Sequence, residues 1–519
     1  MFATKSTTMF FQWSLPFPSF ISSIEILIGS FVAYYICWII YSRFLHPYHD
    51  IPGPFLASIT QWWYFRSIRY CIGENTQLPL HKKYGKFVRI GPNDVQIMDA
   101  KAIDVVYGLK PLFLKTEFYD SFTPNIGGRP DSFTQRDERV HDLTNKKIAS
   151  LFAIGAVLEY EPCVDRVVDI FCDCMDAFAA STETFDISTF CRRYTFDAIG
   201  ELFYGKEGGF GFLRDNKDCF GWMNMLDDMV PIVSSLGYIP WGLKIPYLLS
   251  HLALFPDVRK GLASAEKVKE QSVAVVKERR EALKGAKEAS RNDVLSKLMG
   301  IVTDRGEKID FNDDDVATVV WVSTSRQQMT TDADLDLKAM IWAGSDTTGY
   351  VITGIFYHVL KHPTVYKKLV AEVREAFSDG KLSYPVQYKD AIKLPYLRAC
   401  IAEGFRYSPA SGTGLPRYVP KGGAVISGRY FPEGYKVIIN SNAVHFDKEC
   451  KLVPDHCIPT SHFPGFGEDA EEFVPERWLR HDEKTTAYMS RHDMGFGIGK
   501  RRCLGEKVRK MIIHRSIPS

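Results

Sequence analysis

The stretch FGIGKRRCLG, residues 496–505, decides the fold of this chain of 519 residues. It places Cys503 between glycines and cations. A cysteine thiolate binds haem iron strongly, and the sulfur then needs backbone N–H donors around it and space for a flat macrocycle. Gly499 and Gly505 allow a tight loop that a ligand can approach closely, and Arg501 can form a charge-assisted bond with a haem carboxylate. A basic surface loop that holds a buried cysteine is the competing interpretation.

Five residues of this loop match the pattern F-x-x-G-x-R-x-C-x-G, and the match resembles the haem-binding loop of the cytochromes P-450. The five are Phe496, Gly499, Arg501, Cys503 and Gly505. The resemblance implies that haem b is the cofactor, that Cys503 is the axial ligand of its iron, and that Phe496 covers the sulfur. It also implies a mainly α fold, a helical body with small β-sheets.

Two upstream stretches follow in the order that the family shows. Glu403 and Arg406 in EGFR stand three residues apart on one face of a helix, and PERW adds Arg477. The resemblance implies that these three side chains form a buried ionic cluster, so we assign them to structure rather than to chemistry. Since every charge of such a cluster must be paired, removal of one partner typically costs about 3–5 kcal/mol.

A third stretch, AGSDTT, lies within an expected central helix that ends before Pro363. Asp346 and Thr347 form an acid–alcohol pair that suits proton delivery through water, and Gly344 can open the helix locally to a ligand. A capping or turn motif is the competing interpretation. Branches of the family that rearrange peroxides tend to lack this threonine, so the resemblance implies oxygen activation with Asp346 and Thr347 as catalytic residues.

Further residues are assigned to the haem and to an electron donor. Arg417 in LPRYVP matches a position that contacts a haem carboxylate, although an ordinary strand arginine is the alternative. His141 matches a histidine or tryptophan near the haem edge, and Lys146 follows it at imperfect spacing. Four cations beside Cys503 form either a patch that attracts an acidic electron donor or an ordinary solvated run: Lys500, Arg502, Lys507 and Arg509.

The N-terminal region differs in composition from the rest of the chain. Residues 20–41 contain one charge, Glu25, in 22 residues, which matches the roughly 20 residues of a membrane-spanning helix. Arg43 and further arginines follow the span, and this bias predicts that the body lies on the cytoplasmic side. A cleaved signal peptide and a buried core helix are the alternatives. The predicted organisation is a short segment (1–19), a transmembrane anchor (20–41), a proline-rich linker (42–55) and a haem-thiolate monooxygenase domain (56–519).

Composition argues against several other classes of protein. The net charge of +2 gives no reason to expect nucleic acid as a partner. Eleven cysteines without regular spacing indicate reduced thiols rather than a disulfide scaffold. Periodicity predicts helices over most of residues 136–377, a hairpin around 91–93 and a second hairpin around 432–434.

Three stretches depart from the family pattern: 322–329, 450–465 and 507–519. The first interrupts the approach to the central helix, and the second separates two segments that family members join almost directly. In the third, the chain stops 16 residues after Cys503. We expect the C-terminus to be truncated, and our hypothesis is that all three stretches are translated introns. Real loops together with a genuine truncation are the rival explanation, and the cDNA sequence decides between them.

Together these features predict a membrane-anchored haem-thiolate monooxygenase of the fungal microsomal type, near the pisatin-demethylase-like or secondary-metabolite branch. It would insert one oxygen atom of O2 into a lipophilic small molecule, in secondary metabolism or detoxification. The resemblance implies electrons from NADPH through an NADPH–cytochrome reductase. It also implies a place in the endoplasmic reticulum membrane, with the catalytic domain facing the cytosol. A haem-thiolate isomerase or dehydratase, and an inactive truncated product of a mis-spliced gene, are the alternatives.

Overall fold

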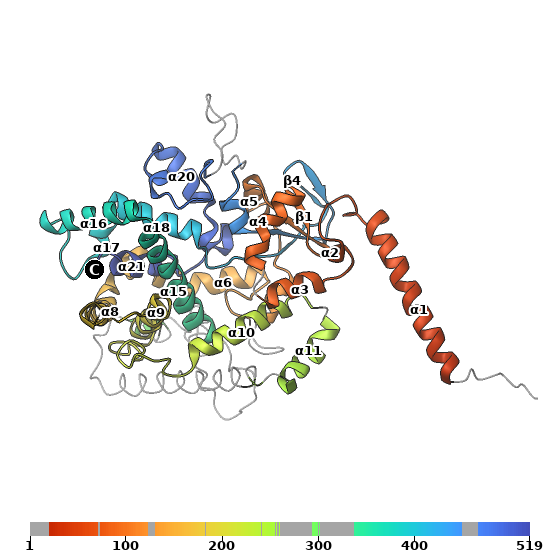
Figure 1. Ribbon diagram of the computed structural model, residues 1–519, viewed down its shortest axis with the longest axis horizontal. Helices are drawn as coiled ribbons and strands as arrows, with labels where there is room; N and C mark the ends of the chain where they lie inside the picture. The colour runs from red at the N-terminus through yellow and green to blue at the C-terminus, as the bar shows by residue number, and fades with distance from the viewer. Residues whose placement is uncertain are drawn as a thin grey trace, which may run out of the picture. The chain divides into compact units, whose positions relative to one another are not determined.

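The chain forms two compact units, Met1–Ile51 and Pro52–Ser519. The computed structural model (Figure 1) describes residues 20–70, 73–122, 130–181, 183–239, 241–254, 256, 259, 293–298, 300–301, 337–448 and 466–519. Two of the stretches that depart from the family pattern, 322–329 and 450–465, therefore lie outside the described residues.

The first unit contains the apolar helix α1 (Phe20–Ile40) and the π-helical turn η1 (Tyr41–Leu45). The segment Ile24–Leu45 is long and apolar enough to cross a membrane, with a mean hydropathy of 1.8, and none of its most apolar window is buried. Burial in a protein core therefore does not account for its hydrophobicity. The predicted helix is confirmed, whereas membrane insertion and the predicted domain boundaries stay predictions.

The second unit is mainly helical, with its strands at one side near α4 and α5 (Figure 1), as the sequence predicts. Its α-helices are α2 (Phe55–Ile59), α3 (Trp62–Arg69), α4 (Gly73–Tyr84), α5 (Ala100–Val106), α6 (Glu138–Ile148), α7 (Ile154–Glu159), α8 (Glu161–Ser181), α9 (Ile187–Tyr204), α10 (Trp222–Leu236), α11 (Trp241–Leu254), α15 (Leu337–Lys361), α16 (Pro363–Ser378), α17 (Tyr388–Ala391), α18 (Pro395–Tyr407), α19 (Ser441–His445), α20 (Glu483–His492) and α21 (Glu506–Ser516).

A four-stranded sheet has the order β1-β2-β6-β3, and a second sheet pairs β4 with β5. The strands are β1 (Phe87–Arg89), β2 (Asp94–Ile97), β3 (Arg417–Tyr418), β4 (Ala424–Ile426), β5 (Arg429–Phe431) and β6 (Lys436–Ile439). The antiparallel pairing of β1 with β2 confirms the predicted hairpin around 91–93.

The second predicted hairpin, around 432–434, is wrong. The hairpin of β4 and β5 turns at Ser427 and Gly428, which both have positive φ angles, 51° and 83°. Two such residues form the tight turn whose twist matches that of paired strands. Residues 432–434 instead lead the chain from β5 into β6, which pairs with β2 and β3 in the other sheet.

Helix α15 is the central helix that the sequence predicts, and it ends before Pro363 as expected. It packs closely along α9: a Cβ added at Gly349 would lie 2.9 Å from the Cα of Arg192, so a glycine is needed there. Val351, Ile352 and Ile355 are fully buried. The helix also has an exposed face, which includes Ala343 and Tyr350.

The side chain of Glu403, on α18, lies at the centre of a buried ionic cluster. Arg406 binds both of its carboxylate oxygens, at 2.9 and 2.7 Å. Arg477, in the 3-10 turn η4 (Pro475–Trp478), donates from Nε at 3.1 Å. The backbone N–H of Val474 and the indole N–H of Trp478 donate at 2.9 Å each. The predicted ionic cluster is therefore present in the structure.

Both arginines of this cluster also donate to backbone carbonyls. Arg406 donates to His445 O and Ala470 O at 2.9 and 2.7 Å, and Arg477 donates to Asp469 O at 2.8 Å. Although burial alone raises the pKa of Glu403, the charges of Arg406 and Arg477 bring it below its ordinary value. A buried ionic cluster is stable only when its donors and acceptors are satisfied in this way. The cluster thus joins α18, α19 and the segment before α20.

The change Glu403→Gln should lower the free energy of unfolding by about 3–5 kcal/mol, because it leaves the buried Arg406 without a counter-charge and Arg477 with Asp469 alone. Urea unfolding followed by circular dichroism measures this loss. The matched control is Glu471→Gln, which removes a half-exposed ion pair with Lys82 and should cost less than about 1 kcal/mol. Equal losses in the two variants would contradict the structural role of Glu403.

Candidate functional site

The loop around Cys503 is held by its own backbone and by two left-handed glycines. The N–H of Cys503 donates to Phe496 O at 2.8 Å and so closes the loop. Gly497 and Gly499 have φ angles of 68° and 71°, which residues with a Cβ rarely adopt. A Cβ on Gly499 would also lie 2.0 Å from the carbonyl oxygen of Tyr107. Gly499 is therefore required by both conformation and space.

Gly505 and Phe496 contribute differently from what the sequence suggests. Gly505 has φ −78°, so its conformation does not need a glycine. Its backbone N–H instead forms a hydrogen bond with the sulfur of Cys503. Phe496 is buried and packs on Phe405 of α18, with ring centroids 4.7 Å apart. The loop therefore rests on the helix that carries the ionic cluster.

The thiol of Cys503 is accessible, yet protein atoms crowd it enough to change its ionisation. Burial raises its pKa, while the Gly505 N–H and the charge of Arg509 act in the opposite direction. An accessible sulfur with a backbone donor beside it can bind a metal that enters from the open side.

A group of cations lies beside this loop. Arg501 donates from Nε and Nη2 to one oxygen of Glu138, on α6, at 2.9 and 2.8 Å, while its buried Nη1 has no hydrogen-bond partner. Lys115 is 4% exposed and donates to Phe133 O at 2.5 Å. Arg417 is buried and donates to the hydroxyl of Tyr119.

These cations act on one another through their charges. Burial, together with the charges of Arg501 and Arg417, lowers the pKa of Lys115 to about 6. His141, on α6, has its pKa lowered by burial and by Arg501 and Lys115. Its Nε2 accepts from Asn145 at 2.9 Å, and its Nδ1 lies 3.5 Å from the carboxylate of Asp142. Glu138 pairs with Arg501, but Lys115 and Arg417 form no ion pair among the described residues, and bound carboxylates would supply one.

The residues therefore fit the haem that the resemblance implies. Haem carries two carboxylates, and the described residues supply three converging basic side chains and the unpartnered Nη1 of Arg501 next to an accessible thiol. The structure brings together all the residues that the sequence assigns to this site: Cys503, Arg501, Phe496, Gly499, Gly505, Arg417 and His141. The sequence analysis did not identify Lys115 as a site residue. The one feature that could have pointed to it is its position among aromatic residues in the sequence.

His445 connects this loop to the ionic cluster. It is fully buried on α19. Its Nδ1 donates to Arg406 O at 2.9 Å, and its Nε2 accepts from the N–H of Met494 at 3.0 Å. Met494 begins the 3-10 turn η5 (Met494–Phe496) that leads into the cysteine loop. Burial lowers the pKa of His445, so the neutral ring that can both donate and accept is favoured.

Asp346 and Thr347 lie on α15 but make separate contacts. Asp346 pairs with Nε of Arg192, on α9, at 2.8 Å. Burial raises the pKa of this carboxyl; the charge of Arg192 opposes the rise and that of Asp227 adds to it. The hydroxyl of Thr347 donates to Ala343 O at 2.5 Å, and Ala343 itself is exposed. The oxygen of Thr347 therefore keeps its acceptor side toward the open face of the helix.

Gly344 lies at the contact between α15 and α9. A Cβ built on it would lie 3.0 Å from Cδ1 of Ile199, on α9. The missing side chain thus serves the close packing of α9 against α15, and its role toward a ligand stays a prediction.

The predicted patch of four cations near Cys503 is only partly correct. Lys500, Arg502 and Lys507 are exposed, and Lys500 pairs with Asp142 at 3.3 Å. Arg509 is buried, since it lies on the inner face of α21, and it cannot contact a docking protein. Lys146 is exposed and makes no contact with His141, whose neighbour is Asn145 instead.

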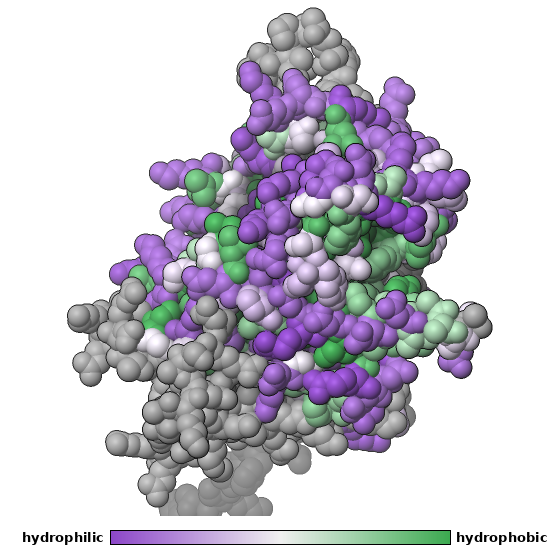
Figure 2. Space-filling model, turned by 90° about the vertical axis from the view of Figure 1, so that its left-hand side faces the viewer, coloured by the Kyte–Doolittle hydropathy of each residue, from purple (hydrophilic) through white to green (hydrophobic). Residues whose placement is uncertain are grey.

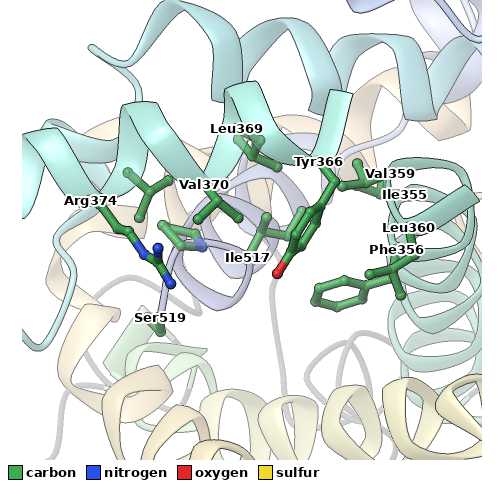
Figure 3. Close-up of a pocket in the computed structure, with 12 residues that line it drawn as sticks. Ile355, Phe356, Val359, Leu360, Tyr366, Leu369, Val370, Arg374, Ile517 and Ser519 are labelled. Atoms are coloured by element: carbon green, nitrogen blue, oxygen red, sulfur yellow. The ribbon is translucent and has the colours of Figure 1, made fainter. Parts of the chain in front are cut away.

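A cavity of about 280 Å³ lies elsewhere in the same unit. Figure 3 shows it between α15, α16 and the last residues of the chain, where Phe356, Tyr366 and Ile517 line it. The face of the molecule drawn in Figure 2 carries hydrophilic residues interspersed with hydrophobic ones. Neither Cys503 nor the group of cations borders this cavity, so it is not part of the candidate site.

Comparisons with known proteins agree with this geometry. The family model described as cytochrome P-450 matches residues 61–515. The chain is 30% identical over 487 residues to the cytochrome P-450 monooxygenase gsfF of Penicillium aethiopicum, covering 93% of this chain and 89% of that protein. It is 30% identical over 499 residues to a pisatin demethylase of Fusarium vanettenii, covering 95% and 87%. It is also 30% identical over 499 residues to the monooxygenase cicH of Emericella nidulans, covering 95% and 91%.

The change Lys115→Met should have opposite effects on the two forms of the protein. Without haem it replaces a buried amine, whose pKa is lowered to about 6, with an apolar side chain, and should stabilise the fold by about 1–3 kcal/mol. With haem it removes a carboxylate partner and should weaken haem retention. Thermal unfolding of both forms and haem transfer to apomyoglobin measure the two effects. The exposed Lys146→Met is the control and should change neither; destabilisation of the haem-free form of Lys115→Met would contradict the assignment.

Stability should fall as the pH drops below about 6.5, the ordinary pKa of histidine. The folded-state pKa of His445 lies below that value, so between the two pKa values the unfolded chain binds more protons, and acid favours unfolding. His445→Gln keeps a donor and an acceptor but does not titrate. The free energy of unfolding of this variant should decline less steeply over this range than that of the parent. The difference between the two slopes should be at most about 1.4 kcal/mol per pH unit. Unfolding curves at pH 7.5, 6.5 and 5.5 test this; parallel pH profiles would refute it.

Proposed function

The chain belongs to the cytochrome P-450 family of monooxygenases, and from that premise we propose that Cys503 is the axial ligand of a haem b. The observation that carries the proposal is an accessible thiol with a Gly505 N–H donor, next to Lys115 and Arg417, which are buried and form no ion pair among the described residues. Arg501, Arg417 and Lys115 would hold the haem carboxylates, with His141 as a further donor.

Bound haem supplies the chemistry that activates O2, so that one oxygen atom enters the substrate and the other leaves as water. The chain's own residues position the reactants and move protons. Asp346 has a raised pKa and lies against Arg192, which fixes its orientation. Thr347 has its hydroxyl proton committed to Ala343 O, so its oxygen can accept a proton donor such as water from the open side. We assign proton delivery to these two residues.

Electrons reach the site from a redox partner, which we propose is an NADPH–cytochrome reductase. The exposed Arg502 and Lys507 lie near Cys503 and can contribute to an attractive field for an acidic donor. We place the catalytic unit at the cytosolic face of the endoplasmic reticulum, with Ile24–Leu45 as its single anchor.

The substrate class that we propose is a lipophilic small molecule of fungal secondary metabolism or detoxification. Two relatives support this choice, a pisatin demethylase and the monooxygenase gsfF. The catalytic unit also contains a buried aromatic group with Phe118, Tyr119 and Tyr238, and aromatic surroundings suit an apolar ligand.

The proposal is tested with the full chain produced in membranes together with a reductase. The reduced protein should give the carbon monoxide spectrum of a thiolate-bound haem, and Cys503→Ala should abolish that spectrum and all turnover. Consumption of O2 and NADPH with substrate separates a monooxygenase from an isomerase or dehydratase, which would turn over without either. A chain that binds no haem would overturn the proposal and favour the inactive product.

The change Asp346→Asn should lower the rate of product formation by about 10²-fold or more, because it removes the proton donor. The carbon monoxide spectrum should stay intact, since Asp346 does not touch the cysteine loop. Asp227→Asn is a matched control: Asp227 binds the same Arg192, at 3.0 Å, but is largely exposed. A similar rate for both variants would show that Asp346 acts only as a partner of Arg192.

A further inference from the structure

Arg509, on α21, is a buried cation six residues after Cys503. It is 7% exposed. Its Nη2 donates to the backbone oxygen of Thr347, on α15, at 2.6 Å. Its guanidinium carbon lies 5.2 Å from the ring centroids of both Phe405 and Phe496. Its Nε has no hydrogen-bond partner. The side chain therefore spans the distance from the cysteine loop to the helix that carries the proposed proton donors.

No carboxylate forms an ion pair with Arg509 among the residues that the structure describes. Burial lowers its pKa to about 10, and the negative groups that oppose this are Cys503 and Asp493. The guanidinium thus stays charged at neutral pH. A buried charge without a partner is costly, and two aromatic faces and one carbonyl compensate it only in part. A negative sulfur at Cys503 is the counter-charge that this position lacks.

The other cations near the loop are already neutralised. Arg502 pairs with Glu506 at 2.5 Å and is largely exposed, and Lys510 pairs with the same carboxylate at 2.7 Å. Lys507 is exposed, so water and salt screen its charge. Arg509 alone among these four is both buried and free of an ion pair in the described part of the chain.

We propose that Arg509 is a fixed counter-charge for the Cys503 sulfur and raises the reduction potential of the haem bound there. This inference rests on the proposed function. Reduction adds one electron, supplied by the redox partner, which converts ferric to ferrous iron without making or breaking a bond. A nearby cation in a medium of low polarity stabilises the more negative ferrous state. Through Thr347 O the same side chain also positions α15, so Arg509 is a positioning residue for both sides of the site.

The test is a spectroelectrochemical titration of the full, haem-loaded chain with chemical mediators, which needs no protein donor. The variants are Arg509→Met and Arg509→Gln, which remove the charge, and Arg509→Lys, which keeps it. In the Arg509→Met and Arg509→Gln variants, the ratio of ferrous to ferric haem at a fixed applied potential should fall at least tenfold. This fall corresponds to a reduction potential that is lower by about 59 mV for one electron. Arg509→Lys should stay within threefold of the parent. Lys507→Met removes an exposed charge from the same helix and should leave the potential unchanged.

Each outcome bears on the charge itself. Unchanged reduction potentials in Arg509→Met and Arg509→Gln would overturn the proposal. An equally large shift in Arg509→Lys would also overturn it. If Arg509→Met and Arg509→Gln fail to retain haem, retention of haem by Arg509→Lys supports a requirement for the charge. Loss of haem in all three variants indicates that the shape of the side chain matters, and it overturns the proposal. A parent chain without a haem spectrum defeats the proposed function, and the inference with it. A parent with haem and variants with unchanged potentials defeats the inference alone.

Discussion

The buried carboxylate of Glu403 is the constraint on which the catalytic unit depends. It fixes Arg406 and Arg477, whose remaining donors bind carbonyls of two separate segments, at His445 and at Asp469–Ala470. From Arg406, the chain of contacts continues through the neutral ring of His445 to the N–H of Met494, where the cysteine loop begins. The position of the sulfur therefore follows from a charge pair more than 90 residues upstream, and any change that protonates or unpairs one member is transmitted to the loop.

Much of the candidate site could be predicted from the sequence because its residues lie in short, regular spacings. The five positions of the cysteine loop, the ionic cluster and the acid–alcohol pair all depend on local order along the chain. Lys115 could not be predicted in this way, because its role arises from the approach of Arg501 and Arg417, which are several hundred residues away. Burial that depends on distant segments leaves no periodic signal in the sequence.

Errors in the predicted structure have equally physical causes. A run of charged residues predicts a solvent-exposed surface, so the sequence places Arg509 in a surface patch. In the helix α21, however, the position of Arg509 on the helical turn directs its side chain into the protein, where it is buried. The turn of the second hairpin lies at Ser427 and Gly428 because two left-handed residues suit a tight turn better than a proline-containing segment. Residues 507–516 form a packed helix, whereas the origin of the three unusual stretches and the truncation stay hypotheses.

The packing of α9 against α15 divides the central helix lengthwise. On the α9 side, a Cβ on Gly349 would lie 2.9 Å from the Cα of Arg192, so any larger residue there would force the two helices apart. On the opposite side, Ala343 and Tyr350 are exposed and can change size without disturbing that contact. Sequence variation is therefore tolerated on one face of α15 and costs stability on the other, within the same 25 residues.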